Sequence, residues 1–126
     1  PRFAGVALPL TWRDGRPEIE ARVSDGAGAL AVRLAPSTGS DAPIRLSEPL
    51  AAVAGASKPD EVYPYGVMRP RLRALSLAGD LFEDLPAGLL KPGGADGWLG
   101  APVLARYRVR FDFPAGVLRL AAPSSR

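Results

Sequence analysis

The segment "RLAPSTGSDAPIRLS", residues 33–47, gathers side chains that could do chemistry in a turn that follows an apolar run ending at Leu34. Ser37 and Thr38 offer hydroxyl groups, and Asp41 offers a carboxylate four residues after Ser37. A hydroxyl acts as a nucleophile only when a neighbouring base takes its proton, and a carboxylate can itself be a base toward a held water. The first question is therefore which bases the chain supplies.

The composition removes most of the common catalytic bases and metal ligands. The 126 residues include no His and no Cys, which excludes Ser-His-Asp and Cys-His catalysis, disulfides and almost every zinc site. The side-chain amines are limited to Lys58 and Lys91. Asp96, in the loop "GGADG", is expected to be a turn residue, because a calcium site needs several spaced oxygens. We expect no metal and no cofactor.

The charge pattern argues against a nucleic-acid partner. The net charge of +3 is mild, and no block of like charges occurs.

No apolar run approaches the roughly 20 residues that span a bilayer, and we recognise no signal peptide. The chain begins at Pro1 without Met, so we expect an N-terminal segment to precede it, and a periplasmic or secreted location stays open. The many Ala, Gly, Pro and Arg residues are typical of a GC-rich bacterial genome.

Short strands position the loop. Alternating apolar and polar side chains, which are typical of half-buried strands, occur in residues 17–24, 29–35, 108–113 and 116–120. In the first of these segments Ile19 and Val23 are expected to face the core, and Glu18 is expected to face solvent. Asp14-Gly15 and the "FPAG" segment at 113–116 are typical of hairpin turns.

Two segments break the alternation and predict short helices. Ser47 is a suitable N-cap for the segment that follows it, and Pro49 fits the first turn of that helix. Residues 100–107 predict a second helix, with Pro102 in its first turn. Many short strands with two brief helices indicate a single mostly β domain over residues 1–126, built as a small closed barrel or a sandwich.

Several motifs follow one another in the same order as in a known family. Trp98-Leu99-Gly100 is an apolar-apolar-Gly motif, residues 101–107 supply a short helix and an aromatic, and residues 108–120 supply a closing hairpin. In this order they resemble bacterial retropepsin-like aspartic protease domains. Residues 8–34 look like the opening hairpin and the strand that leads to the catalytic loop. The resemblance is most specific over residues 71–120, and it implies a small closed β-barrel with one or two short helices.

The catalytic loop departs from that family at the residue that does the chemistry. The family carries Asp-Thr/Ser-Gly at the strand end, whereas this chain has Ser37-Thr38-Gly39, and an alternative register puts Ala35 at the acid position. Aspartic proteases hold two carboxylates that share one proton, so that one activates water while the other polarises the carbonyl. A Ser hydroxyl cannot replace such a base, so we expect a degenerate catalytic loop and negligible peptidase activity.

Asp41 is the fallback acid, because it lies in the same loop as Ser37. A catalytic role would require this side chain to turn inward. The simpler interpretation is a solvent-facing turn residue, and Asp25 in "SDGAG" is interpreted in the same way.

The resemblance also implies a flap and a partner subunit. The flap, a hairpin that folds over bound peptide, would lie in residues 60–72. Its turn would be at Gly66, and its apolar anchors would be Tyr63, Tyr65 and Met68. Packing of an edge strand on the barrel explains Tyr63 and Tyr65 equally well. One such domain is half of an active site, so the resemblance implies a two-fold homodimer in which two Ser37–Gly39 loops face each other.

Three hypotheses for the function follow. The leading one is non-catalytic, either the binding of a peptide or protein segment by strand addition or a structural role in a larger chain. The second is an active aspartic endopeptidase that works as a homodimer with Asp41 or with an acid from another chain. The third is an unrelated small β-barrel interaction module with a different strand order. The first predicts a cleft without a carboxylate pair, and the second predicts paired carboxylates across a dimer axis.

Overall fold

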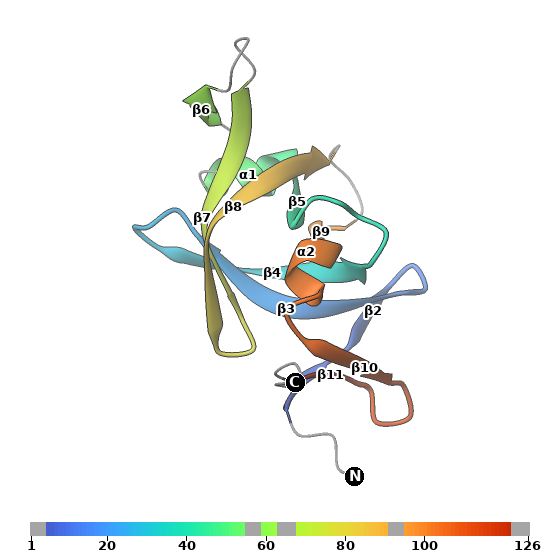
Figure 1. Ribbon diagram of the computed structural model, residues 1–126. Coiled ribbons are helices and arrows are strands. Elements are labelled where there is room, and N and C mark those ends of the chain that lie inside the picture. Colours follow the sequence, from blue (N-terminus) through green and yellow to red (C-terminus); the bar gives the residue numbers. More distant parts are fainter. Residues whose placement is uncertain (1–4, 55–58, 63–67, 91–94, 122–126) are drawn as a thin grey trace.

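The computed structural model describes residues 5–54, 59–62, 68–90 and 95–121, and most of them lie in strands (Figure 1). Two short helices, α1 (Glu48–Val53) and α2 (Ala101–Leu104), interrupt the strands. The strands are β1 (Val6–Pro9), β2 (Thr11–Arg13), β3 (Arg16–Ser24), β4 (Ala29–Ser37), β5 (Ile44–Ser47), β6 (Pro59–Val62), β7 (Met68–Leu77), β8 (Asp80–Leu90), β9 (Gly97–Gly100), β10 (Arg108–Asp112) and β11 (Val117–Ala121). The expected mostly β class with two short helices is confirmed.

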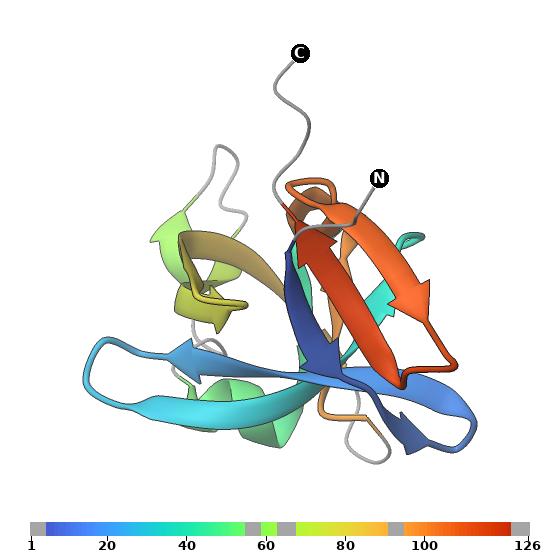
Figure 2. The same cartoon turned by 90° about the horizontal axis from the view of Figure 1, so that it is seen from below.

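Most of the strands close into a barrel. The larger sheet has the order β2-β3-β4-β9-β5-β8-β7-β6, and an additional pairing of β3 with β7 closes the ring between those two strands. The smaller sheet, β1-β11-β10, lies to one side of the barrel (Figure 2). Of the two architectures expected from the sequence, the closed barrel is confirmed.

Aliphatic side chains from alternating strand positions fill the barrel. Ile19, Val23 and Leu34 are fully buried, as the alternation in β3 and β4 predicts. The smaller sheet adds Leu118 and Leu120 to the same core cluster, so the two sheets share one core. Removal of this apolar area from water is the main force that holds the loops at the barrel ends in place.

The hairpin turns have the geometry that their residues predict. Asp14 and Gly15 both have positive φ angles, 52° and 77°, which is the signature of a two-residue type I′ turn between β2 and β3. Gly116, at the end of the "FPAG" segment, has a φ of 69° and closes the turn between β10 and β11. Both turns therefore depend on residues that tolerate the left-handed region.

Asp25 is a turn residue, as expected. Its Oδ1 accepts hydrogen bonds from the N–H groups of Ala27 and Gly28, at 2.8 and 3.2 Å. These two backbone donors hold the pKa of the Asp25 carboxyl below its usual value. The side chain therefore stabilises the turn between β3 and β4 as an anion.

Both predicted helices are present, and both begin with a proline in the first turn. Pro49 and Pro102 occupy first-turn positions, where a backbone N–H has no acceptor within the helix, so the missing N–H costs no hydrogen bond. Ser47 is the N-cap residue of α1, but its hydroxyl makes no capping hydrogen bond, and its N–H donates instead to the carbonyl of Asp96. α2 ends at Leu104, earlier than predicted, and no helix of the described residues is long and apolar enough to cross a membrane.

Tyr107 ties the segment after α2 to the β7–β8 hairpin. Its hydroxyl donates to Asp80 Oδ2 at 2.8 Å, and its ring lies edge-on to Phe82 at 6.1 Å between centroids. Burial raises the pKa of the Tyr107 phenol well above its usual value, and the hydrogen bond to Asp80 adds to this effect. The phenol therefore stays protonated and anchors the end of α2 to the barrel.

Candidate functional site

β4 leads directly into the loop that carries the candidate residues. β4 runs parallel to β9, and Ser37 lies beside Gly100 in the register. The Ser40 N–H donates to the Ser37 carbonyl at 3.2 Å, which closes a tight turn. Ser37 is half-buried, whereas Thr38 and Gly39 are exposed. The loop therefore presents its Thr-Gly step to solvent at the end of the strand.

Gly100, which ends the apolar-apolar-Gly motif, is the point where the loop meets β9. Its N–H donates to the Pro43 carbonyl at 2.9 Å, and the Ala101 N–H donates to the Ser40 carbonyl at 3.0 Å. A Cβ atom at position 100 would lie 1.8 Å from the Ala42 carbonyl oxygen. Only glycine permits this approach of two backbones, so the motif positions the loop.

Gly97 makes a second close approach, which sequence reasoning missed. A Cβ atom at this position would lie 2.2 Å from the Arg45 carbonyl oxygen and 2.9 Å from Leu34 Cδ2. β5 pairs antiparallel with β9 and parallel with β8, so the far end of the loop is held between two strands. A glycine at each end of β9 therefore determines where the loop lies.

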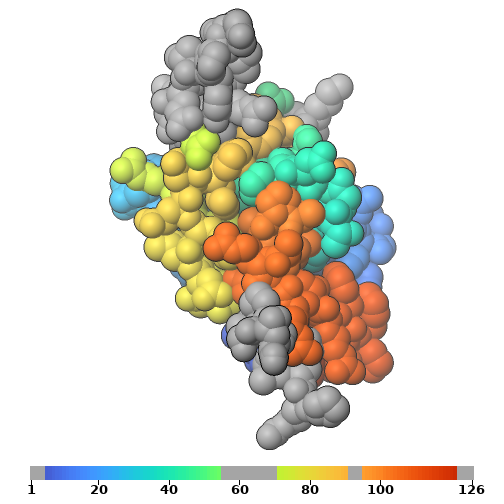
Figure 3. All heavy atoms as spheres, in the orientation of Figure 1, coloured from blue at the N-terminus to red at the C-terminus, as the bar shows by residue number. Residues whose placement is uncertain are grey.

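A groove of about 620 Å³ lies between the loop, β8 and α2. It is lined by Asp41, Ala42, Pro43, Arg45, Pro86, Ala87, Gly88 and Pro102. The three segments meet on the face that Figure 3 shows, where the loop is teal and α2 is orange. Asp41 is exposed and is the single acid among the described residues that line the groove, and Ser37 is not one of them.

The predicted flap lies only partly within the described residues. Tyr63, Tyr65 and Gly66 fall outside them, and Met68 is the first residue of β7. β6 pairs antiparallel with β7, with Val62 opposite Met68. The backbone on either side of residues 63–67 therefore forms an antiparallel pair, which extends from the barrel at the top of Figure 1.

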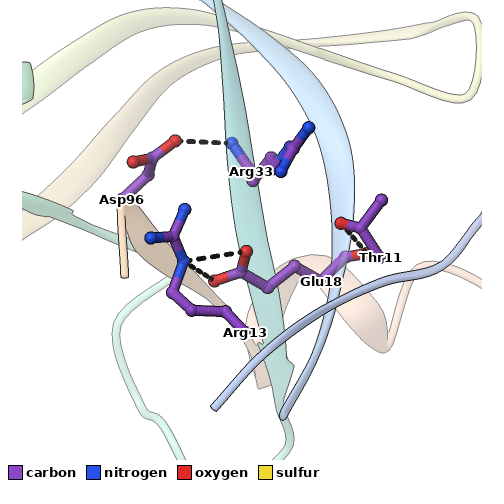
Figure 4. A network of polar contacts seen from close by, with 5 residues as sticks. All are labelled: Thr11, Arg13, Glu18, Arg33 and Asp96. Atoms are coloured by element: carbon purple, nitrogen blue, oxygen red, sulfur yellow. Dashed lines mark hydrogen bonds and ion pairs between the residues drawn. The ribbon is translucent and has the colours of Figure 1, made fainter. Parts of the chain in front are cut away.

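A buried ion pair lies where the alternation predicts a solvent-facing carboxylate. Glu18 is only 1% exposed, and Arg13 Nε donates to both of its oxygens, at 3.2 and 3.1 Å (Figure 4). The prediction for Glu18 is wrong because β2 pairs with the start of β3, which brings the Arg13 side chain over the Glu18 carboxylate. The guanidinium compensates the buried charge.

Asp96 is more than the turn residue that the sequence predicts. Its Oδ2 accepts a hydrogen bond from the Arg33 N–H at 3.0 Å, and its carbonyl accepts one from the Ser47 N–H at 2.8 Å (Figure 4). Asp96 therefore ties the start of β9 to β4 and to the N-terminus of α1. Within the described ranges, no group of three or more acidic side chains could hold a metal ion.

An exposed aromatic surface, made of Trp12, Phe111 and Phe113, also escaped sequence reasoning. Trp12 and Phe113 are 56% and 54% exposed, and their ring centroids are 5.9 Å apart. Phe111 stacks on Phe113 with centroids 5.6 Å apart. Alternation assigns Phe111 and Phe113 to a half-buried face, but β10 is the last strand of the smaller sheet and the barrel covers this face only in part.

Comparison with solved structures agrees with this architecture. No family model matches the chain, and no curated protein matches it. The structure is similar to that of a retropepsin-like aspartic protease from Rickettsia conorii, with a TM-score of 0.63, 20% identity, and coverage of 98% of this chain and 99% of that one. It is also similar to the retroviral protease-like domain of Ddi1 from Leishmania major, with a TM-score of 0.53, 14% identity, and coverage of 97% and 96%. The different strand order that the third hypothesis predicts is therefore wrong, and the chain has the retropepsin-like fold.

Proposed function

We propose that this domain binds an extended peptide or protein segment and does not cleave it. The observation that carries the proposal is the residue at the end of β4. This strand ends at Ser37, the position that the family resemblance assigns to the catalytic acid, and Thr38-Gly39 follow as they do in the family. The proposed site thus keeps the loop of an aspartic protease and lacks its acid.

The chemistry of the reaction explains why one side chain matters. Two carboxylates in contact share a proton because they cannot both ionise, and this shared proton lets the pair act as base and acid at once. A hydroxyl at position 37 neither shares that proton nor accepts one from water. General-base catalysis contributes roughly 10²–10⁴-fold, and no histidine in the chain could activate Ser37 in another way.

An aspartic endopeptidase that uses Asp41 is the second candidate. Asp41 is exposed and lines the groove beside the loop, so a bound peptide could reach it. No second acid among the described residues lines this groove. The shared-proton mechanism would therefore need a carboxylate from another chain.

The proposed binding unit is a homodimer. The family resemblance implies this assembly, and the aromatic surface is the interface that we propose for it. Clustered, half-exposed aromatic side chains are enriched at protein interfaces, and β10 is an edge strand with a backbone that another strand can extend. Two copies that meet through this surface would bury rings that one copy leaves in water.

Replacing Trp12 and Phe113 together by Ser is expected to weaken the homodimer at least tenfold. Truncation of an aromatic residue in the centre of an interface costs about 2 kcal/mol or more. Sedimentation equilibrium gives the dissociation constants of the wild type and the variant. Leu81→Ser, which removes an exposed apolar side chain of the β7–β8 hairpin, is the matched control and is expected to leave the constant unchanged. A wild-type protein that stays monomeric at high concentration contradicts the dimer.

A cleavage screen separates the two candidate functions. The purified domain is incubated at high concentration with a diverse peptide library from about pH 3.5 to 7, where shared-proton carboxylates operate, and mass spectrometry reads the products. Asp41→Ala is tested beside the wild type. We expect no cleavage by either protein. Cleavage by the wild type that disappears in Asp41→Ala would establish the peptidase and make Asp41 its acid.

A further inference from the structure

Arg45 differs from the other half-buried arginines of the described residues. Each of the others pairs with a carboxylate: Arg13 with Glu18, Arg71 with Asp84, and Arg119 with Asp112. Arg45 is also half-buried, yet its guanidinium makes no ion pair or hydrogen bond within the described part of the chain. Partial loss of water around a charge is costly unless a partner compensates it. The position of Arg45 therefore suits an anionic group supplied by a ligand.

Gly88 gives the Arg45 side chain its place. Ile44 and Leu46, on either side of Arg45 in β5, are fully buried, so Arg45 points away from the core. A Cβ atom at position 88 would lie 3.0 Å from Arg45 Cγ and 3.6 Å from Nη1. The arginine stem therefore lies across β8 where that strand has no side chain, and the guanidinium lies along the groove wall.

The remaining groove wall suits an apolar side chain. Besides Asp41 and Arg45, its lining consists of Ala42, Pro43, Pro86, Ala87, Gly88 and Pro102. Its volume of about 620 Å³ lies within the roughly 300–1,000 Å³ of typical ligand pockets. No ion pair joins Asp41 to Arg45, so the two charges are separate features of the groove.

We infer that this groove holds an extended peptide segment in which an acidic residue stands next to an apolar one, with the acidic side chain paired to Arg45. The inference rests on the proposed function, binding without cleavage, and names the segment that is bound. The apolar residue packs against the prolines of the groove. Asp41 is an acceptor for N–H groups of the segment. An arginine guanidinium binds a carboxylate through two parallel hydrogen bonds, which makes it selective for that group.

The test compares two peptide sets that differ only in charge. One set carries Glu beside Leu, Val or Phe, and the other carries Gln at the same position. Both are passed over the immobilised wild-type domain at neutral pH, and the retained peptides are quantified. We expect the Glu peptides to be retained about tenfold more strongly, since a hydrogen bond to a charged group is worth about one factor of ten. The preference is expected to weaken as salt is added.

Variants of Arg45 decide the outcome. Arg45→Gln is expected to abolish the preference for Glu peptides, and Arg45→Lys is expected to keep part of it. Arg22→Gln, which changes an exposed arginine of β3, is the matched control and is expected to keep all of it. Equal retention of both sets by the wild type, or an unchanged preference in Arg45→Gln, would overturn the inference and leave the proposed function standing. Retention of neither set would overturn both.

Discussion

Gly100→Ala is expected to lower the free energy of unfolding by about 3 kcal/mol, the upper end of the range for overpacking. The new Cβ would lie 1.8 Å from the Ala42 carbonyl oxygen. A backbone atom cannot relieve this clash by a rotation about χ angles, as a side chain could. Relief requires the loop to move away from β9, which breaks the hydrogen bonds that Gly100 and Ala101 donate to Pro43 and Ser40. Urea unfolding followed by tryptophan fluorescence measures the change.

Gly39→Ala is the matched control in the same loop. A Cβ atom at position 39 meets nothing within 4 Å, and the backbone there is not in the left-handed region. We expect a change within about 0.5 kcal/mol, as for most exposed substitutions. If Gly100→Ala were as stable as Gly39→Ala, the close approach of β9 to the loop would not be what positions Ser37.

Arg13→Met is expected to destabilise the fold by about 3 kcal/mol, because it leaves the buried Glu18 carboxylate without its partner. Glu18→Met is expected to cost less, since Arg13 is about one-third exposed and can return to water. The double variant is expected to be no less stable than Glu18→Met alone, because a buried ion pair replaced by apolar side chains is often neutral.

A double-mutant cycle of these three variants gives the coupling energy between Arg13 and Glu18. Arg22→Met, at an exposed position of the same strand, controls for the general effect of exchanging an arginine for methionine. Equal losses for Arg13→Met and Glu18→Met, with additive effects in the double variant, would show that the pair is not coupled. The burial of Glu18 would then not depend on Arg13.

Local chemistry made much of the fold predictable from sequence. Asp14-Gly15 predicts a type I′ turn because both residues tolerate a positive φ, and both adopt one. Alternation in residues 17–24 places Ile19 and Val23 in the core, where they are. Pro49 and Pro102 predict helix starts, because the fixed φ and the missing N–H of a proline suit the first turn of a helix and depend on no distant contact.

Contacts between distant segments could not be predicted in this way. The burial of Glu18 depends on β2 lying against the first residues of β3, and alternation within β3 alone contains no such information. Gly97 lies against the Arg45 carbonyl and the Leu34 side chain, and Asp96 accepts a hydrogen bond from the Arg33 N–H. All three partners are far away in the chain.

The candidate site also has parts that the sequence predicts and parts that depend on contacts between distant segments. The loop Ser37–Gly39 and the motif that ends at Gly100 are readable because the family resemblance assigns them roles. The groove forms only when β5, β8 and α2 come together, so no single segment of the sequence predicts it. The same holds for Arg45, whose guanidinium makes no ion pair or hydrogen bond among the described residues. The aromatic surface is hidden for a related reason, because Phe111 has the spacing of a buried strand residue and its exposure is set by the edge position of β10.

The most direct test of the central claim is to incubate peptides for a long time with the immobilised domain and to measure the masses of the peptides that elute. The incubation is at about pH 5, which lies within the range in which a shared-proton dyad operates. We predict that a subset of the peptides is retained and that every retained peptide elutes with its original mass. New termini in the eluted or unbound peptides, absent when the domain is omitted, would contradict the claim that a retropepsin-like fold with Ser37 in the acid position binds without cutting.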